Sequence, residues 1–173
     1  VFDKFHIAQH LGRAVDEVRR AENRELVQEG DDRLKKTKYL WLMNPGRMSQ
    51  ERWGGFASLR DSQLRVARAW AIKETLRDLW GYRSVTWARK FFKNWYGWAR
   101  RSQLSPVKKV AATFKHHLAN ILTYCNHQIT NAVAEGINSK IMAIKRLAGG
   151  YRNKENFKTA IYFFCGGLDL YPR

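Results

Sequence analysis

The stretch VTWARKFFKNWYGWARR, residues 85–101, carries the clearest helical pattern in the sequence. At a turn of about 100° per residue, its apolar side chains fall within an arc of about 140°. That arc holds Trp87, Ala88, Phe91, Phe92, Trp95, Trp98 and Ala99. The opposite arc holds Arg89, Lys90, Lys93, Arg100 and Arg101. The pattern predicts an amphipathic helix whose large aromatic residues are buried and whose cations face solvent.

Similar patterns predict helices through most of the remaining chain. Apolar residues recur at helical spacing, and Ser, Asn or Pro at the beginnings and Gly at the ends are typical start and stop signals. The expected helices cover residues 4–29, 49–59, 61–80, 105–127, 131–147 and 156–165. We therefore expect a mainly α protein.

One segment departs from this helical pattern. Tyr39–Met43 is a short run of large apolar residues followed by the turn signal Asn44-Pro45-Gly46, which predicts a single buried strand. Val1-Phe2, an apolar pair leading directly into Asp3, is expected to be the end of a second strand whose sheet partners lie upstream. On this interpretation the chain is a fragment of a larger protein.

Length and composition limit the class of protein. The 173 residues are enough for one domain with its own core, and a hydrophobic share of 45% excludes wholesale disorder. No apolar run approaches the roughly 20 residues needed to cross a bilayer, so we expect no membrane partner. The two cysteines, Cys125 and Cys165, are too few for a disulfide scaffold; we expect both to be buried in a reducing cytoplasm.

The charge of the chain points to a polyanionic partner. The net charge is +17, which favours nucleic acid ahead of a membrane surface. Residues 1–78 carry 16 basic and 12 acidic side chains, whereas residues 79–173 carry 16 basic and only three acidic ones. Most of the positive field therefore belongs to the second half of the chain.

The basic arc of residues 85–101 has two interpretations. It can follow a phosphate backbone, where each neutralised phosphate releases counterions and adds sequence-independent affinity. A solvated helix face would show the same pattern, and charge alone weights the two equally. The tryptophans favour core packing over base stacking, because they lie on the other arc.

Motifs for metal or nucleotide chemistry are weak. His6 and His10 lie one helical turn apart, with Asp3 a turn earlier, but a zinc motif also needs its Glu and a third ligand at a defined spacing. Ordinary polar contacts at a helix start are the favoured interpretation. The sequence has no GxGxxG, GxxxxGK[ST] or GxSxG motif, which argues against a nucleotide-binding protein or a serine hydrolase.

Glu135 is the most informative acid. On the expected helix over residues 131–147 it lies opposite the apolar arc, among cations. An acid in the first helical turn is favoured by the helix dipole, by about 0.3–1 kcal/mol. Alternatively, a carboxylate on a basic surface can hold Mg²⁺ against phosphates. The residue pattern alone leaves both interpretations open and favours the first.

The sequence around Glu135 resembles a known family. Thr130–Lys140, continued by Ile144–Arg146 and Gly149–Asn153, is similar to the third-carboxylate block of the DDE transposases of bacterial insertion sequences. Val1–His6 resembles the strand end that bears their second carboxylate. The resemblance spans the whole chain and is to the ISL-type family, whose ribonuclease-H-like catalytic fold carries a helical insertion before the glutamate.

This resemblance implies a division of the chain and a set of acids. Residues 1–46 would be a partial catalytic fold with its last strand at 39–43, residues 47–128 the helical insertion, and residues 129–173 catalytic helices. The family's second acid falls on Asp3 and its third on Glu135. Its first aspartate would lie upstream of Val1, and no residue of this chain matches it.

The family's chemistry is phosphoryl transfer on DNA with two Mg²⁺ or Mn²⁺ ions. Asp3 and Glu135 would be catalytic metal ligands, but two acids leave one metal with too few protein ligands, so the chain alone is expected to be inactive. The full-length protein is expected to be a homo-oligomer in the bacterial cytoplasm, associated with the nucleoid, with transposon ends and target DNA as partners.

The residues expected to contact DNA are Arg89, Lys90, Lys93, Arg100, Arg101, Lys140, Lys145, Arg146 and Arg152. A competing hypothesis comes from another class of protein. In a non-catalytic, helical nucleic-acid-binding module, the same cations would bind DNA, and Glu135 would be only a helix-start acid.

Overall fold

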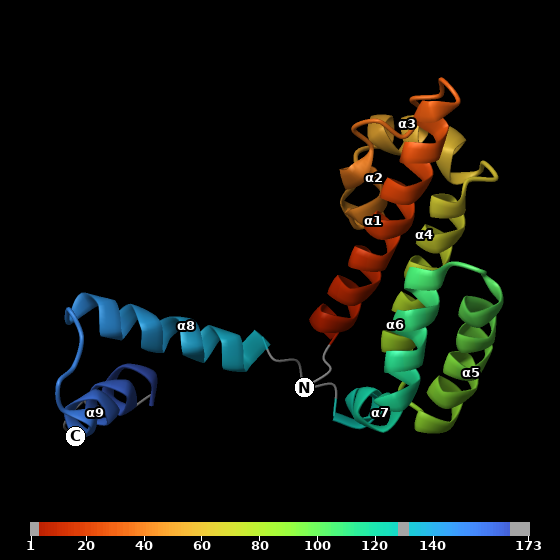
Figure 1. The fold of residues 1–173 in the computed structure, drawn as a ribbon. Coiled ribbons are helices and arrows are strands. Elements are labelled where there is room, and N and C mark those ends of the chain that lie inside the picture. The colour runs from red at the N-terminus through yellow and green to blue at the C-terminus, as the bar shows by residue number, and fades with distance from the viewer. Residues whose placement is uncertain (1–3, 128–131, 167–173) are drawn as a thin grey trace. The chain divides into compact units, whose positions relative to one another are not determined.

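The computed structural model describes residues 4–127 and 132–166, apart from the side chains of residues 124–127 and 132–135. The chain divides into two compact units, which we call unit 1 (residues 1–128) and unit 2 (residues 129–173). Figure 1 traces the helices of both units.

Every regular element in the described residues is helical, with no β-strand among them. Unit 1 contains α1 (Lys4–Gln28), α2 (Lys38–Leu42), α3 (Gln50–Arg60), α4 (Arg65–Leu76), α5 (Val85–Arg101), α6 (Ser105–His116) and α7 (Leu118–His127). The 3-10 turns η1 (Pro45–Arg47) and η2 (Arg77–Gly81) precede α3 and follow α4. Unit 2 contains α8 (Ala132–Leu147) and α9 (Lys154–Cys165). The expected mainly α class is confirmed.

The core of unit 1 forms along α1. The apolar stripe of this helix is buried, as its spacing predicts: Ile7, Leu11, Val15 and Val18. This stripe packs against α4 and α6, which run beside α1 in Figure 1. The helix ends next to Gly30, whose φ of 83° lies in the left-handed region that glycine adopts without strain. The predicted helix and its stop signal are confirmed.

The predicted strand at Tyr39–Met43 is wrong, because this segment forms the short helix α2. Trp41 is fully buried, whereas the neighbouring Tyr39 is 71% exposed. The Trp41 Nε1 donates to Thr37 Oγ1 at 3.2 Å, one turn earlier. A five-residue apolar run does not distinguish strand from helix by its period, and no described strand pairs with it. Val1-Phe2, the other expected strand, lies outside the described residues.

An aromatic cluster joins α2, α3 and α4. The ring centroids of Trp41 and Phe56 are 4.7 Å apart in an edge-to-face arrangement, and those of Phe56 and Trp70 are 5.4 Å apart. Trp53 completes the cluster at 6.0 Å from Phe56. The buried Lys73 on α4 donates from Nζ to the backbone oxygen of Trp41 at 2.8 Å. These contacts explain how such a short helix holds its place.

Apart from shifts of one or two residues, three helix boundaries differ from the sequence prediction, and one of them is the end of α4 at Leu76, where η2 follows, and not at Trp80. Asp61 does not begin the next helix but follows α3, where its Oδ1 pairs with Arg60 Nε at 2.6 Å, and α4 starts only at Arg65. The expected helix over residues 105–127 is interrupted at His117, which has a φ of −99° and a ψ of 17° and separates α6 from α7. The helix over residues 85–101 is confirmed with its predicted bounds.

Helix α5 packs against α4, α6 and α7 through one side only. Ala88, Phe92, Trp95 and Ala99 form its buried seam. Trp95 is 2% exposed, and its Nε1 donates to the backbone oxygen of Ile72 on α4 at 2.9 Å. This bond satisfies a buried indole donor and fixes the rotation of α5 about its axis.

Unit 2 is a pair of helices that contact each other. Helix α8 ends as predicted at Gly149 and Gly150, whose φ values are 61° and 104°. In unit 2, Ile144 is buried among the described side chains, and α9 buries none of its residues. Cys165 is half-buried rather than buried, and the side chain of Cys125 lies outside the described residues.

The expected division at residues 46 and 128 stays a prediction. Helices α1 and α2, which the resemblance assigns to a partial catalytic fold, pack within the same compact unit as the helices assigned to the insertion.

Candidate nucleic-acid interface

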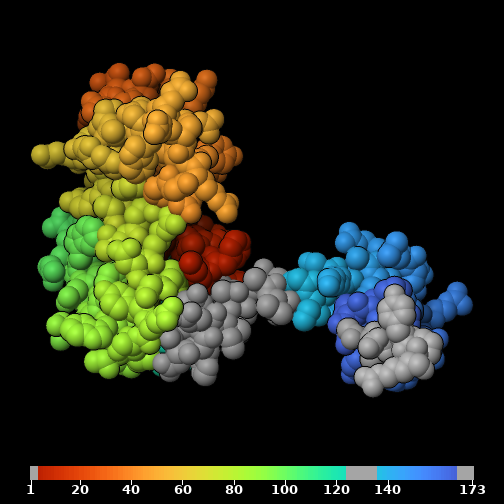
Figure 2. Space-filling model, turned by 180° about the vertical axis from the view of Figure 1, so that it is seen from behind, coloured from red at the N-terminus to blue at the C-terminus, as the bar shows by residue number. Residues whose placement is uncertain are grey.

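Five of the predicted DNA-binding residues lie on α5 and are all exposed. We call them the α5 basic face: Arg89, Lys90, Lys93, Arg100 and Arg101. Helix α5 follows η2 and occupies an outer position in unit 1, where its yellow-green atoms form part of the surface in Figure 2. Because α5 buries only one seam, the opposite arc is free to present its cations to solvent.

No carboxylate close in sequence compensates these cations. Between Asp78 and Glu135 the chain has nine Lys and Arg residues and no acid. None of the five side chains of the α5 basic face pairs with a described carboxylate. A cluster of like charges without counterions in the protein produces a strong positive potential that attracts polyanions.

Helix α6 adds cations that the sequence analysis missed. Lys108, Lys109 and Lys115 are exposed on α6, which packs against α5. The Lys115 Nζ lies 5.0 Å from the centroid of the Tyr96 ring, so at least this cation reaches the surface of α5. The available signal was that all three lie outside the apolar stripe of residues 105–127.

In unit 1 many acids are already paired with cations. Asp16 contacts Arg19 and Arg20, and Arg65 contacts both Glu22 and Glu25. Among the exposed pairs, the hydrogen bond from Arg33 lowers the pKa of the Asp31 carboxyl. Arg60 lowers the pKa of Asp61 in the same way. The first half of the chain therefore offsets most of its positive charge, whereas within unit 1 the helices α5 and α6 carry cations and no acid.

The aromatic arc of α5 is buried only in part. Trp95 and Phe92 are each 2% exposed, and Phe91 and Trp98 are half-buried against the core. The prediction that Trp87 is buried is wrong, because this side chain is 59% exposed. On the helical wheel Trp87 lies about 110° from the centre of the buried seam. The spacing predicted which residues share one side of α5. It did not predict which part of that side packs most closely against the neighbouring helices.

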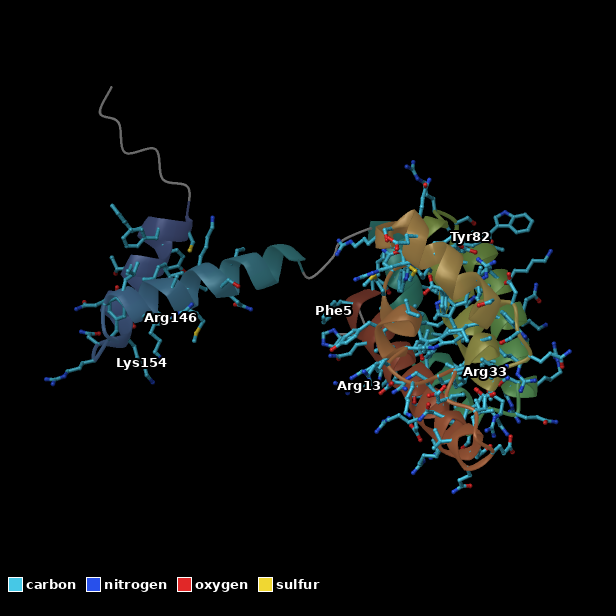
Figure 3. All side chains as sticks on the ribbon, turned by 90° about the horizontal axis from the view of Figure 1, so that it is seen from above. Phe5, Arg13, Arg33, Tyr82, Arg146 and Lys154 are labelled. Atoms are coloured by element: carbon cyan, nitrogen blue, oxygen red, sulfur yellow. The ribbon has the colours of Figure 1, made fainter. Side chains whose placement is uncertain are left out.

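The four remaining predicted cations belong to unit 2 and are also exposed: Lys140, Lys145, Arg146 and Arg152. Figure 3 labels Arg146 on α8 and Lys154 at the first turn of α9. The Arg146 Nε donates to the backbone oxygen of Met142 at 3.3 Å. These cations form a second basic region, on a unit of their own.

Neither predicted acid has a described side chain. Asp3 lies outside the described residues, and Glu135 lies in the first turn of α8 without a described side chain. Among the described residues there is no group of three or more His, Cys, Asp or Glu that could hold a metal ion. Carboxylate oxygens suit Mg²⁺ and Mn²⁺, but Asp3 and Glu135 are fewer than the three acids expected.

The two early histidines contact aromatic rings. His6 lies 6.0 Å from Phe5, and His10 lies 6.3 Å from Phe114 on α6, both edge-to-face and measured between ring centroids. His10 therefore contributes to the contact between α1 and α6. Within the described ranges 4–127 and 132–166, no helix has the length and apolar character to cross a membrane.

Comparison with known proteins gives consistent matches. A family model of the ISL3-type DDE transposases, described as Transposase, matches residues 1–161. The transposase for insertion sequence element IS1001 of Bordetella parapertussis is 31% identical over 160 residues, which cover 91% of this chain and 39% of that protein. The transposase for IS1557 of Mycobacterium tuberculosis is 26% identical over 123 residues, covering 71% and 28%.

This chain therefore spans less than half the length of these curated relatives. No solved structure matches it significantly.

Proposed function

Because the chain belongs to the ISL3 family of DDE transposases, we propose that it is part of the catalytic region of a DNA transposase and that its α5 basic face binds DNA. One observation carries the DNA-binding part of the proposal. Five exposed cations of α5 lie in an acid-free stretch of the chain and have no described carboxylate partner.

The dimensions of α5 suit a phosphate backbone. From Arg89 to Arg100 the helix rises about 16 Å, at 1.5 Å per residue. A strand of DNA carries one phosphate per about 3.4 Å of helix axis, so this length corresponds to about five phosphates. Contacts of this kind are independent of base sequence and release counterions, which makes the affinity strongly dependent on salt.

The salt dependence of DNA binding tests this proposal. We expect the triple variant Arg89→Ala, Lys93→Ala, Arg100→Ala to bind duplex DNA more weakly. The slope of log affinity against log salt should become shallower by up to about 2.7, since each phosphate contact contributes about 0.9. An unchanged slope would place the DNA path elsewhere.

A matched control variant removes three positive charges from cations that already contact a carboxylate of the protein. Arg20, Arg33 and Lys35 are exposed cations of unit 1, and each contacts a carboxylate, which Arg20 shares with Arg19. Their triple alanine variant should leave the slope nearly unchanged. If it lowered the slope equally, net charge rather than the α5 basic face would explain the binding.

The catalytic part of the proposal concerns Asp3 and Glu135. We propose that both are metal-binding acids of the longer protein, completed there by a further carboxylate. Bound Mg²⁺ or Mn²⁺ would supply activation of a water or a 3′-hydroxyl and stabilisation of the leaving oxygen. In the same proposal the longer protein acts as a homo-oligomer on transposon ends and target DNA in the bacterial cytoplasm.

The alternative function is a non-catalytic, helical nucleic-acid-binding module. The position of Glu135 in the first turn of α8 favours it, because an acid there is stabilised by the helix dipole without any metal. Both functions share the α5 basic face. The effect of Glu135→Gln on strand transfer separates them.

A further inference from the structure

Trp87 is exposed beside the cations of the α5 basic face. It lies in the first turn of α5, where 59% of it is open to solvent, while Trp95 on the same helix is 2% exposed. The Lys90 Nζ lies 5.1 Å from the centroid of the Trp87 ring, in a cation–π arrangement. The structure thus combines an open indole with a cation that belongs to the α5 basic face.

On the helical wheel Trp87 lies at the boundary between a polar, basic side and a half-buried aromatic side. Lys90 and Asn94 lie within about 60° of it on one side and are exposed, whereas the half-buried Phe91 and Trp98 lie within about 40° of it on the other side. Arg83, four residues before Trp87, is exposed as well. Tyr82, which is labelled in Figure 3, packs against Phe91, with ring centroids 5.3 Å apart. The indole therefore borders the cations and lies outside the buried seam.

A single exposed aromatic residue is ordinary, so its surroundings decide the argument. Tyr39 provides the comparison, since it is 71% exposed and Lys38 Nζ lies 5.8 Å from its ring. It belongs to residues 1–78, where 12 acids accompany 16 cations. Trp87 instead lies in the acid-free stretch of the chain, where a polyanion would be held.

We infer that Trp87 stacks on an unpaired base of DNA held by the α5 basic face, and that its ligand is DNA with a single-stranded or unpaired segment. The inference rests on the proposed function. In a paired duplex each base face is covered by its neighbours, whereas an unpaired base offers a free face to an aromatic ring. Lys90 and its neighbours would hold the adjacent phosphates.

The test compares two DNA probes with the intact 173-residue chain. One is a fully paired duplex, and the other is the same duplex with a short single-stranded tail. Trp87→Ala should weaken binding to the tailed probe by about 5- to 150-fold, the range that corresponds to the loss of one stacked base. Binding to the paired duplex should change less than twofold. Trp87→Phe, which keeps a smaller ring, should give an intermediate loss.

Fluorescence provides an independent measurement. The chain has seven tryptophans. Subtracting the fluorescence emission of Trp87→Phe from that of the wild type gives a difference signal that reports on the Trp87 indole. Stacking should quench this difference signal when the tailed probe is added, and the paired duplex should leave it unchanged. Thermal unfolding confirms that each variant is folded, as expected for the substitution of a mainly exposed side chain.

Tyr39→Ala is the matched control and should bind both probes like the wild type. The inference is overturned if Trp87→Ala binds the tailed probe as tightly as the wild type, if it loses equal affinity for both probes, or if Tyr39→Ala produces the same loss. In each case the wild-type chain still binds DNA and the proposed function stands. If the wild type binds neither probe, the proposed function fails, and the inference fails with it.

Discussion

Glu22 shows how one residue can determine where a distant helix begins. Its carboxylate is buried and accepts hydrogen bonds from the backbone N–H groups of Arg65 at 2.7 Å and Val66 at 2.8 Å. Leu64, at the N-cap position of α4, has no side-chain acceptor for these donors. The cap of α4 therefore comes from α1, which explains why α4 starts at Arg65 and not at the Asp61 or Ser62 that the local sequence favours.

We predict that Glu22→Gln lowers the free energy of unfolding by about 1–3 kcal/mol. The amide keeps one acceptor oxygen but turns an NH₂ group towards a backbone donor, which leaves that buried donor unsatisfied. Urea unfolding should show a lower midpoint with an unchanged slope. Glu25 is an exposed partner of the same Arg65. Glu25→Gln should therefore lower the free energy of unfolding by less than about 1 kcal/mol. Equal midpoints for Glu22→Gln and the wild type would refute the capping role.

Lys73 gives the fold a pH dependence. Its side chain is buried, and this desolvation lowers its pKa from the ordinary 10.5 despite the contact with Glu74. Between the lowered pKa and 10.5, the unfolded chain binds a proton that the folded chain has released. Stability contributed by this group therefore rises with pH in that window and is absent below it.

The expected result is a growing difference between the wild type and Lys73→Met. The variant also loses the hydrogen bond to the Trp41 backbone oxygen, at a cost of about 1–3 kcal/mol at every pH. Above neutral pH the gap in free energy of unfolding should widen as the pH approaches 10.5. Urea unfolding at a series of pH values measures it, with the exposed Lys35→Met as control. A constant or shrinking gap would contradict the direction of the pKa shift.

At the scale of elements, the sequence predicts helices well where the pattern is local. The buried stripe of α1 and the bounds of α5 follow from the spacing of apolar residues. The end of α8 follows from glycines with a left-handed backbone. Both signals can be read from residues close together in sequence. The helix α2 depends on Lys73, which lies 32 residues from Trp41 in sequence. The start of α4 depends on Glu22, which lies at least 43 residues away. Contacts at such separations leave no periodic signal.

The two kinds of glycine in unit 2 should respond oppositely to alanine. Gly150 has a φ of 104°, so Gly150→Ala should destabilise the end of α8 by at least about 1 kcal/mol. Gly136 lies inside α8, and a methyl group added there would meet open space, so Gly136→Ala should stabilise the helix by about 0.5–1 kcal/mol. Amide hydrogen exchange of α8 measures both changes. The same sign for both would show that backbone conformation does not govern this helix.

The two units differ as whole bodies in how much apolar surface they bury. Unit 1 has a continuous core, which the side chains of α1, α4, α5 and α6 share. Unit 2 exposes large apolar side chains among its described residues: Ile137, Met142, Leu147, Tyr162, Phe163 and Phe164. Among the described residues, the apolar core of the chain therefore belongs mainly to unit 1.

The candidate site was predictable only in part from the sequence. The α5 basic face follows from periodicity and charge, so its exposure could be predicted. The exposure of Trp87 could not, because it depends on how α5 is rotated against α4, where Trp95 bonds to Ile72. The pairing of Asp3 with Glu135 comes from resemblance and stays a prediction, since residues far apart in sequence reveal no distance by their pattern.

Catalysis should require the longer protein. If Asp3 and Glu135 are two of three metal-binding acids, the 173 residues alone should neither nick nor join DNA with Mg²⁺, whereas the longer protein should do both. In the longer protein, Asp3→Asn or Glu135→Gln should abolish strand transfer and spare the binding of transposon ends. Each substitution removes a metal ligand and not a phosphate contact.

Glu135→Gln should leave DNA binding intact or strengthen it, because it removes a negative charge from a basic surface. Gel assays of nicking and joining, run beside binding assays, separate the two effects. Retained strand transfer in Glu135→Gln would remove the catalytic role of this residue and favour the helix-start acid of a DNA-binding module. Cleavage by the isolated chain would instead require the missing acid to lie within these 173 residues.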